Sequence, residues 1–277
     1  MTTARIDACF AALKAEGRAA FIAYVMAGDP DAETAFEILK GLPSAGADII
    51  ELGFPFSDPM AEGPPVQRAA LRGLASGTTL KATLELVRRF RGVDAVTPIV
   101  LMGYLNPILS AGFEAFARDA GAAGVDGLIV VDCPPEEADP LVDALDAHQI
   151  SLIRLATPTT DARRLETVVR RTSGFVYYVS VAGVTGVKEA DADAVAPAVE
   201  RVRKASGLPV AVGFGIRTPE RAAAVARVAD AVVVGSALVD EIAAGLAAHE
   251  AVTPRVLAAS ARLAKAVREA GQTAVRA

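Results

Sequence analysis

One strand and the loop after it decide the fold and the chemistry of this chain: IIELGFPFSDPMAEGP, residues 49–64. The isoleucines predict a strand over Asp48–Gly53. Glu51 stands among apolar residues of that strand, which disfavour its charged form and should raise its pKa toward neutrality. The loop beyond the strand carries two more carboxylates, Asp58 and Glu62. We expect an active site at this strand end, although a strand-end glutamate that is simply solvated at the rim stays an alternative.

Short β-branched runs alternate with longer amphipathic stretches on both sides of this segment. The eight predicted strands are Ala20–Met26, Asp48–Gly53, Pro98–Met102, Gly127–Asp132, Ser151–Ala156, Phe175–Ser180, Pro209–Gly213 and Ala229–Gly235. The predicted helices between them are Asp31–Ala45, Thr79–Arg91, Gly112–Ala123, Glu136–His148, Asp161–Thr172, Asp191–Ala205 and Thr218–Val228. A strand–helix unit repeated eight times is typical of the (β/α)₈ TIM barrel, an α/β fold. An open doubly wound sheet is the alternative, but no Gly-x-Gly-x-x-Gly turn follows the first strand.

Two helical regions lie outside this repeat. An extra N-terminal helix, about Arg5–Glu16, precedes the first strand and could cap the barrel floor. Extended C-terminal helices continue from Ala237 to about Ala270, and Pro254 should break them into two pieces. No linker or change of composition divides the chain, so residues 1–277 are expected to form a single domain.

Composition excludes several classes of function. The 277 residues are 52% hydrophobic and carry a formal charge of -5, with scattered basic residues, which argues against a nucleic-acid partner. Two cysteines, Cys9 and Cys133, cannot form a disulfide framework, and their spacing fits no zinc site. The only histidines, His148 and His249, are expected at the surface. Without a signal sequence or a membrane span, a soluble cytoplasmic protein is expected.

Glycine clusters follow three consecutive strands and predict a phosphate site. They are Gly183–Gly186, Gly213–Gly215 and the pair Gly235-Ser236, where Ser236 is the expected N-cap of a helix. Glycine lets backbone N–H groups approach an anion, and a helix N-terminus adds partial positive charge. Tight turns alone would also explain any one cluster. The loop 181–191 and the loop 54–65 are candidate lids, since both follow the carboxyl ends of strands.

The remaining polar residues favour acid–base chemistry by carboxylates without a metal or cofactor. No lysine falls on a predicted strand, which disfavours a Schiff-base aldolase, and no histidine falls at a strand end. The candidate acid–base groups are Glu51, Asp58, Glu62, Asp132, Tyr24, Tyr104 and Tyr177. An aromatic or apolar substrate body would suit the apolar set Phe21, Ile22, Tyr24, Leu101, Met102, Ile129 and Phe214.

The run Glu51–Pro64 closely resembles the signature of the tryptophan synthase alpha subunit family. The likeness extends to Gly28-Asp29-Pro30, Ala182–Gly186, Gly213–Ile216 and Gly235-Ser236, and so covers nearly the whole chain. It implies a lyase of tryptophan biosynthesis that cleaves indole-3-glycerol phosphate to indole and glyceraldehyde 3-phosphate. It also implies that indole passes to a pyridoxal-phosphate beta subunit in an α₂β₂ complex.

The resemblance implies a role for each matching residue. Glu51 matches the catalytic glutamate that protonates indole C3, and Glu62 matches the carboxylate that accepts the indole N–H. Tyr177 matches a tyrosine of the substrate pocket, and Thr185 a threonine that closes over it. Asp58 matches a residue that faces the beta subunit. The backbone phosphate cradle corresponds to Gly186, Gly215, Gly235 and Ser236.

The chain departs from the family pattern at two positions. Glu62 stands where aspartate is usual and reaches about 1.5 Å farther, a displacement that can cost about 10²-fold in rate on a fixed backbone. Val181 stands where arginine is common. Two other functions stay open: a non-catalytic barrel that only regulates a beta subunit, and another phosphate-binding barrel enzyme such as a phosphoribosyl isomerase.

Overall fold

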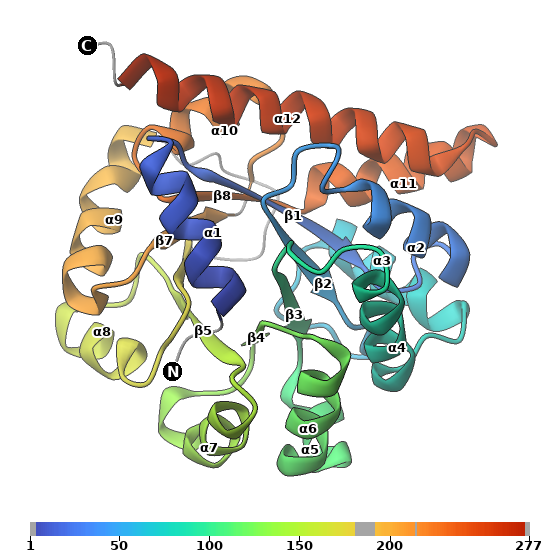
Figure 1. The fold of residues 1–277 in the computed structure, drawn as a ribbon, viewed down its shortest axis with the longest axis horizontal. Helices are drawn as coiled ribbons and strands as arrows, with labels where there is room; N and C mark the ends of the chain where they lie inside the picture. Colours follow the sequence, from blue (N-terminus) through green and yellow to red (C-terminus); the bar gives the residue numbers. More distant parts are fainter. Residues whose placement is uncertain (1–3, 181–191, 214, 275–277) are drawn as a thin grey trace.

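Eight short parallel strands close into a barrel in which each strand pairs with its neighbours along the chain and β1 pairs with β8 (Figure 1). The computed structural model describes residues 4–180, 192–213 and 215–274. The strands are β1 Ala20–Met26, β2 Ile49–Gly53, β3 Ile99–Gly103, β4 Gly127–Val130, β5 Ser151–Ala156, β6 Val176–Val179, β7 Val210–Gly213 and β8 Ala231–Val234. The predicted TIM barrel is therefore confirmed, and the open sheet is excluded.

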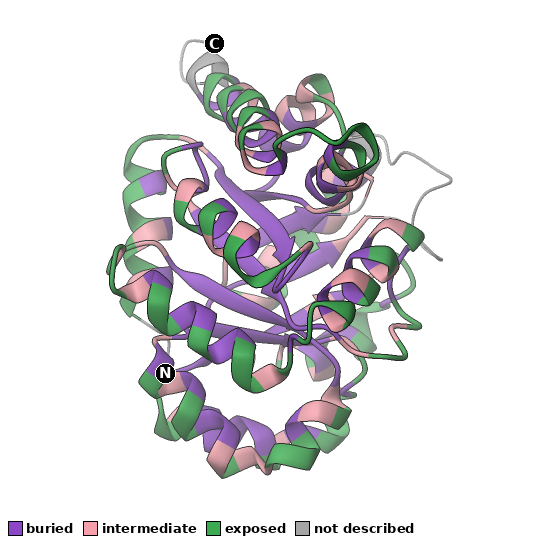
Figure 2. Ribbon diagram, turned by 90° about the vertical axis from the view of Figure 1, so that its right-hand side faces the viewer, coloured by how far each residue is buried: buried purple, intermediate pink, exposed green. Residues whose placement is uncertain are grey.

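Helices surround the barrel and bury only their inner sides (Figure 2). Those from the amino-terminal half are α1 Ala4–Ala15, α2 Ala32–Gly41, α3 Pro64–Ala75, α4 Leu80–Arg91, α5 Leu105–Ala111 and α6 Phe113–Ala123. The 3₁₀ turn η1 Pro135–Glu137 precedes α7 Asp139–Ala147, α8 Ala162–Val169, α9 Ala192–Ser206, α10 Pro219–Ala226, α11 Ser236–Ala248 and α12 Val252–Ala274.

Successive strand residues alternate between two apolar layers. In β2, Ile50 and Leu52 belong to the layer between strands and helices, whereas Ile49 belongs to the cluster inside the barrel. A strand reverses its side chains at every residue, so Glu51 shares the inward side with Ile49. Each fully buried isoleucine or leucine stabilises the fold by about 1.5–3 kcal/mol. The carboxyl group of Glu51 is thus held inside a well-packed barrel by its apolar strand neighbours.

Helix α1 closes the amino-terminal end of the barrel, as expected for the extra helix. Ile6, Phe10 and Leu13 of α1 join the inner cluster. The ring of Phe10 lies 5.8 Å from that of Phe175, which immediately precedes β6. The apolar side of α1 is therefore part of the barrel core at this end.

The C-terminal helices break earlier than predicted. Helix α11 ends at Ala248, His249 adopts a left-handed conformation with φ 54°, and α12 begins at Val252. Pro254 therefore lies in the first turn of α12 and does not interrupt a helix. Proline is tolerated there because the first N–H groups of a helix have no partner within it.

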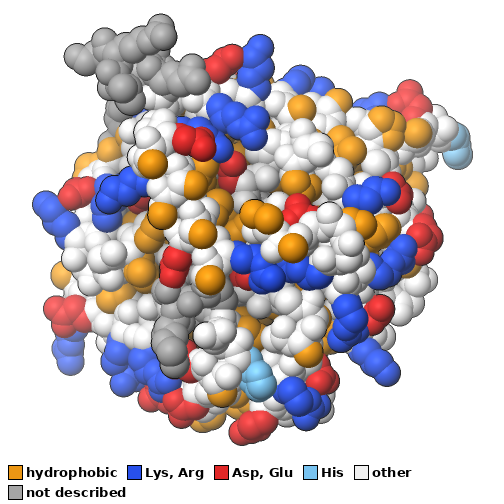
Figure 3. Space-filling model, viewed as in Figure 1, with side chains coloured by type: hydrophobic (Ala, Val, Ile, Leu, Met, Phe, Trp, Pro, Cys, Tyr) orange, Lys and Arg blue, Asp and Glu red, His pale blue; other side chains and the backbone are white. Residues whose placement is uncertain are grey.

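Charged side chains are spread over the molecule. On the face shown in Figure 3, basic and acidic groups are interspersed. His148 and His249 are exposed, as expected, and both cysteines are free. Within residues 4–180, 192–213 and 215–274, no helix is long and apolar enough to cross a membrane.

Candidate active site

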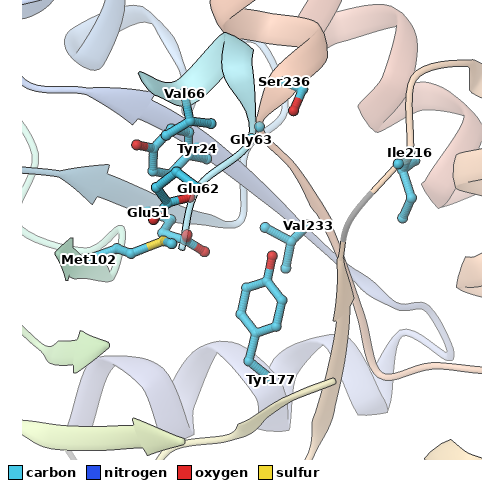
Figure 4. Close-up of a pocket in the computed structure, with 12 residues that line it drawn as sticks. Tyr24, Glu51, Glu62, Gly63, Val66, Met102, Tyr177, Ile216, Val233 and Ser236 are labelled. Carbon is cyan, nitrogen blue, oxygen red and sulfur yellow. The ribbon is translucent and has the colours of Figure 1, made fainter. Parts of the chain in front are cut away.

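A pocket opens among the carboxyl ends of the strands and brings together residues from both halves of the chain (Figure 4). Its lining consists of Tyr24, Glu51, Glu62, Gly63, Val66, Met102, Tyr177, Gly215, Ile216, Val233, Gly235 and Ser236. Figure 4 shows the two glutamates close together, with Tyr177 reaching toward them from β6. Ser236 lies away from the glutamates, at the start of α11.

Glu51 is a buried carboxyl that is held protonated near neutral pH. In the sheet, Glu51 is aligned with Tyr24 of β1 and Val100 of β3, and the residue is 2% exposed. Its Oε2 atom has no hydrogen-bond partner among the described residues. Burial, and secondarily the negative charge of Glu62, raises the pKa of Glu51 to about 8. A carboxyl in this state can donate a proton at neutral pH.

Glu62 reaches the same pocket from the loop between β2 and α3. Burial raises its pKa to about 7, so Glu62 loses its proton before Glu51 as the pH rises. The loop is fixed on each side of Glu62: the N–H of Ala61 donates to the hydroxyl of Tyr104 at 2.9 Å, and Gln67 donates to the Glu62 carbonyl at 3.0 Å. The ring of Phe56 also stacks on Tyr104 at 5.2 Å. These contacts set the loop backbone from which Glu62 enters the pocket.

A buried ion pair anchors the helix that follows Glu62. Arg72 of α3 donates to both carboxylate oxygens of Asp29, at 2.6 and 2.7 Å, and the Asp29 side chain is fully buried. Asp29 lies just beyond β1, so this bidentate pair ties α3 to the end of that strand. Removing one partner of such a pair would leave a buried charge uncompensated.

Glycines make room for the two pocket tyrosines. A Cβ atom at Gly53 would stand 2.5 Å from the hydroxyl of Tyr24, and one at Gly213 would stand 2.1 Å from that of Tyr177. Burial raises the pKa of both tyrosines well above the usual value, so both stay neutral. The rings therefore act as neutral walls of the pocket and keep water away from the carboxyls.

The opposite end of the pocket is built from backbone. Gly215 adopts φ 77°, and Gly235 and Ser236 begin α11. The prediction that Ser236 is the N-cap is wrong: Gly235 occupies that position, and no side chain of the described residues caps α11. Because the first N–H groups of a helix have no acceptor within it, an uncapped N-terminus in a pocket suits an anion such as phosphate.

Seven of the predicted site residues line this one pocket: Glu51, Glu62, Tyr24, Tyr177, Gly215, Gly235 and Ser236. Asp58 is exposed on the loop before Glu62 and does not line it. Three further predicted residues, Thr185, Gly186 and Phe214, fall outside the described residues.

Sequence reasoning missed four residues of the lining: Gly63, Val66, Ile216 and Val233. A signal existed for Val233, which lies two residues before Gly235 and so on the same side of β8. Of the predicted apolar wall, Met102 lines the pocket, whereas Phe21 and Leu101 belong to the layer under the helices. Side chains alternate between the two faces of a strand, so the positions of Phe21 and Leu101 within β1 and β3 place them on the outer face.

The pocket combines a protonated carboxyl, a second carboxyl that ionises first, and an uncapped helix N-terminus at the far end. Among the described residues, no cluster of histidine, cysteine or carboxylate side chains could hold a metal. The arrangement suits proton transfer to and from a substrate whose other end carries a phosphate.

Comparison with known proteins shows the family. The family model for the tryptophan synthase alpha chain matches residues 10–268. The chain is 76% identical to the tryptophan synthase alpha chain of Phenylobacterium zucineum (strain HLK1), over 97% of each chain. It is 73% identical to that of Caulobacter vibrioides (strain NA1000 / CB15N), over 98% of each.

Solved structures agree with this assignment. The alpha subunit from Legionella pneumophila str. Paris has a TM-score of 0.90 and 41% identity, covering 97% of this chain and 100% of that one. A chain of Mycobacterium tuberculosis tryptophan synthase has a TM-score of 0.87 and 38% identity, covering 97% and 99%. With its barrel, its paired carboxyls and these relatives, the chain belongs to the tryptophan synthase alpha chain family.

Proposed function

We propose that this pocket performs the alpha reaction of tryptophan synthase, the cleavage of indole-3-glycerol phosphate to indole and glyceraldehyde 3-phosphate. The observation that carries the proposal is the pairing of Glu51, with a pKa of about 8, and Glu62, with a pKa of about 7, at one end of a pocket. The uncapped start of α11 at the other end supports a phosphate site.

The chemistry follows from the protonation states. Glu51 gives its proton to indole C3, which turns the ring into a leaving group and places positive charge on the ring nitrogen. Glu62, ionised, accepts the indole N–H and stabilises that charge. The hydroxyl on the carbon bonded to C3 then loses its proton to Glu51 as the carbon–carbon bond breaks. The bonding electrons return to the ring, and an aldehyde and indole leave.

Replacement of Glu51 by glutamine tests this proposal. Glu51→Gln should lower the rate of indole formation by about 10²–10⁴, the range for loss of a general acid–base group. Binding of glycerol 3-phosphate, measured by calorimetry, should persist because the phosphate end is unchanged. Glu33→Gln is the matched control, since Glu33 is exposed and pairs with Arg89 on the outer surface. Wild-type turnover in Glu51→Gln would contradict the roles given to this pocket, whereas the absence of indole release by the wild-type chain would favour a barrel that only regulates its partner.

A tryptophan synthase beta subunit is the proposed partner, in an α₂β₂ complex that receives the indole. Apolar side chains beside the pocket support this: Met60 is 83% exposed on the loop before Glu62, and Leu109 of α5 is 52% exposed. The stack of Phe56 on Tyr104 joins that loop to the start of α5. Exposed apolar side chains beside the opening of a pocket are typical of a surface that binds another protein. Asp58, on the same loop, is proposed to face it.

We also propose that Thr185 closes over the substrate, that Gly186 contributes to the phosphate cradle and that Phe214 lines the indole site. We further propose that the chain forms a single domain and is located in the cytoplasm.

A further inference from the structure

Three charged side chains meet beside the phosphate end of the pocket. Asp240 of α11 accepts a hydrogen bond from Arg217, and its other carboxylate oxygen lies 3.8 Å from Nη2 of Arg68 in α3. Both arginine side chains are about half exposed, and Asp240 is about one-third exposed. We call Arg68, Asp240 and Arg217 the rim cluster. Two positive charges and one negative charge leave it a net charge of +1.

Each member of the rim cluster follows closely on a residue that lines the pocket. Asp240 comes four residues after Ser236, the first residue of α11. Arg217 comes two residues after Gly215, whose backbone has the left-handed φ of 77°.

Arg68 holds the equivalent place on α3. It comes four residues after Pro64, the first residue of that helix, whose N-cap Gly63 also lines the pocket. Helical side chains four residues apart share a face and lean toward the N-terminus. The side chains of Arg68 and Asp240 therefore lean toward the helix ends that meet at the pocket, and the cluster stands at its rim.

We propose that Arg68 and Arg217 guide the phosphate dianion of the substrate to the backbone cradle, from positions that Asp240 holds. This inference rests on the proposed function and adds a positioning role for side chains to a site otherwise built from backbone. The guanidinium groups act through the solvent at the rim, where long-range attraction raises the local concentration of an anionic substrate. The cradle itself then binds the phosphate.

The same contacts of Asp240 with Arg68 and Arg217 would also be seen if the rim cluster had only a structural role. In that case Asp240 would only tie α3, α11 and the loop after β7 together, and the sign of the charges would not matter to the substrate. The two roles differ in their dependence on salt. Attraction between exposed charges is screened over about 10 Å at 0.1 M ionic strength, whereas the loss of a mechanical tie is felt at every salt concentration.

The experiment compares charge-removing variants with a charge-keeping one. Arg217→Gln and Arg68→Gln should each raise the KM for indole-3-glycerol phosphate by about two- to fivefold at low ionic strength, and the double variant by about tenfold, with kcat unchanged. The dissociation constant of glycerol 3-phosphate should rise in parallel. These differences should shrink at about 0.5 M salt. Arg217→Lys keeps the charge and should remain close to wild type.

Arg118→Gln is the matched control, because Arg118 is an exposed arginine of α6 that pairs with its neighbour Asp119. Glutamine variants of the rim cluster that behave like Arg118→Gln would overturn the inference. An effect equal at low and high salt, or one that Arg217→Lys shares, would overturn it in favour of the mechanical tie. If the wild-type protein binds glycerol 3-phosphate but releases no indole with or without a beta subunit, the proposed function fails, and the salt-dependent binding test still decides the role of the rim cluster.

Discussion

Two glutamates with the same side chain acquire different protonation states from their positions in the barrel. Glu51 comes from a strand interior and Glu62 from a loop that is fastened over the barrel mouth. Within the part of the chain that the structure describes, no arginine or lysine lies within ion-pair distance of either. Burial therefore decides both pKa values, and the charge of one carboxyl raises the pKa of the other.

The pH dependence of catalysis should report this pair. The reactive form has Glu62 ionised and Glu51 protonated, so kcat/KM should rise through a pKa of about 7 and fall through a pKa of about 8. Glu62→Gln should lose the acidic limb and move the alkaline limb to lower pH, because the Glu62 charge that raises the pKa of Glu51 is gone. Steady-state rates of indole release between about pH 6 and 9 measure this. A flat profile in the wild-type protein would contradict the pairing.

At the residue scale, the sequence predicts one member of the pair better than the other. The raised pKa of Glu51 follows from its strand neighbours, which are adjacent in the chain. Glu62 is surrounded by proline, glycine and polar residues in sequence, and nothing local indicates burial. It becomes 6% exposed because Tyr104, 42 residues away, fixes the preceding Ala61.

At the scale of single elements, strand-end glycines determine where the pocket tyrosines can lie. The absence of a Cβ atom at Gly213 lets the hydroxyl of Tyr177 lie against β7, and Gly53 does the same for Tyr24 against β2. These positions need a small residue for the shape of the pocket. A methyl group there would collide with a ring that lines the substrate site.

Gly213→Ala should therefore push Tyr177 into the pocket. We expect kcat/KM to fall about tenfold or more, because small displacements in a catalytic site are costly, and stability to fall by about 1–3 kcal/mol from overpacking. Kinetics and urea unfolding measure the two effects. Gly92→Ala is the control, at an exposed position whose nearest neighbour, a carbonyl oxygen, would lie 3.2 Å from the new Cβ. Full activity in Gly213→Ala would show that the ring has room to retreat.

The element that the sequence did not predict is α5. Its first turn contains Asn106 and Pro107, which locally favour a loop. The N–H of Leu105 is instead satisfied by Asp132, which lies beyond β4 and accepts it at 2.7 Å. Because the capping residue Asp132 belongs to another strand–helix unit, the sequence around α5 itself contains no helix start signal. The strands, by contrast, were predicted to within about two residues because each carries its own β-branched run.

At the scale of the whole molecule, the repeat of strand and helix was enough to predict the barrel, since eight consecutive units close with few alternatives. The exposed surface was less predictable. Met60 and Leu109 are 49 residues apart, and only the fold shows that the segments carrying them are joined beside the pocket mouth through Phe56 and Tyr104.

Charges placed on that surface should separate the chain from its partner. Met60→Asp and Leu109→Asp should weaken association with a beta subunit, because each buries a charge in an apolar contact, while indole release by the isolated chain stays near wild type. Analytical ultracentrifugation and rates with added beta subunit measure this. Val96→Asp is the control, since Val96 is 79% exposed before β3, at the other end of the barrel. If Met60→Asp and Leu109→Asp bind a beta subunit as tightly as Val96→Asp does, the partner binds to another surface.

The two interior carboxyls also couple the folding equilibrium to proton uptake. Both have a pKa in the folded chain above the unfolded value of about 4.5, so the native state binds protons that the denatured chain releases. Their contribution to the free energy of unfolding is complete below about pH 4.5 and is lost as the pH rises through about 7 and 8. Denaturation midpoints should therefore decline with rising pH more steeply in the wild-type protein than in Glu51→Gln. The molecule is then least resistant to unfolding on the alkaline side of the pH range where it works, and bound substrate would offset that weakness.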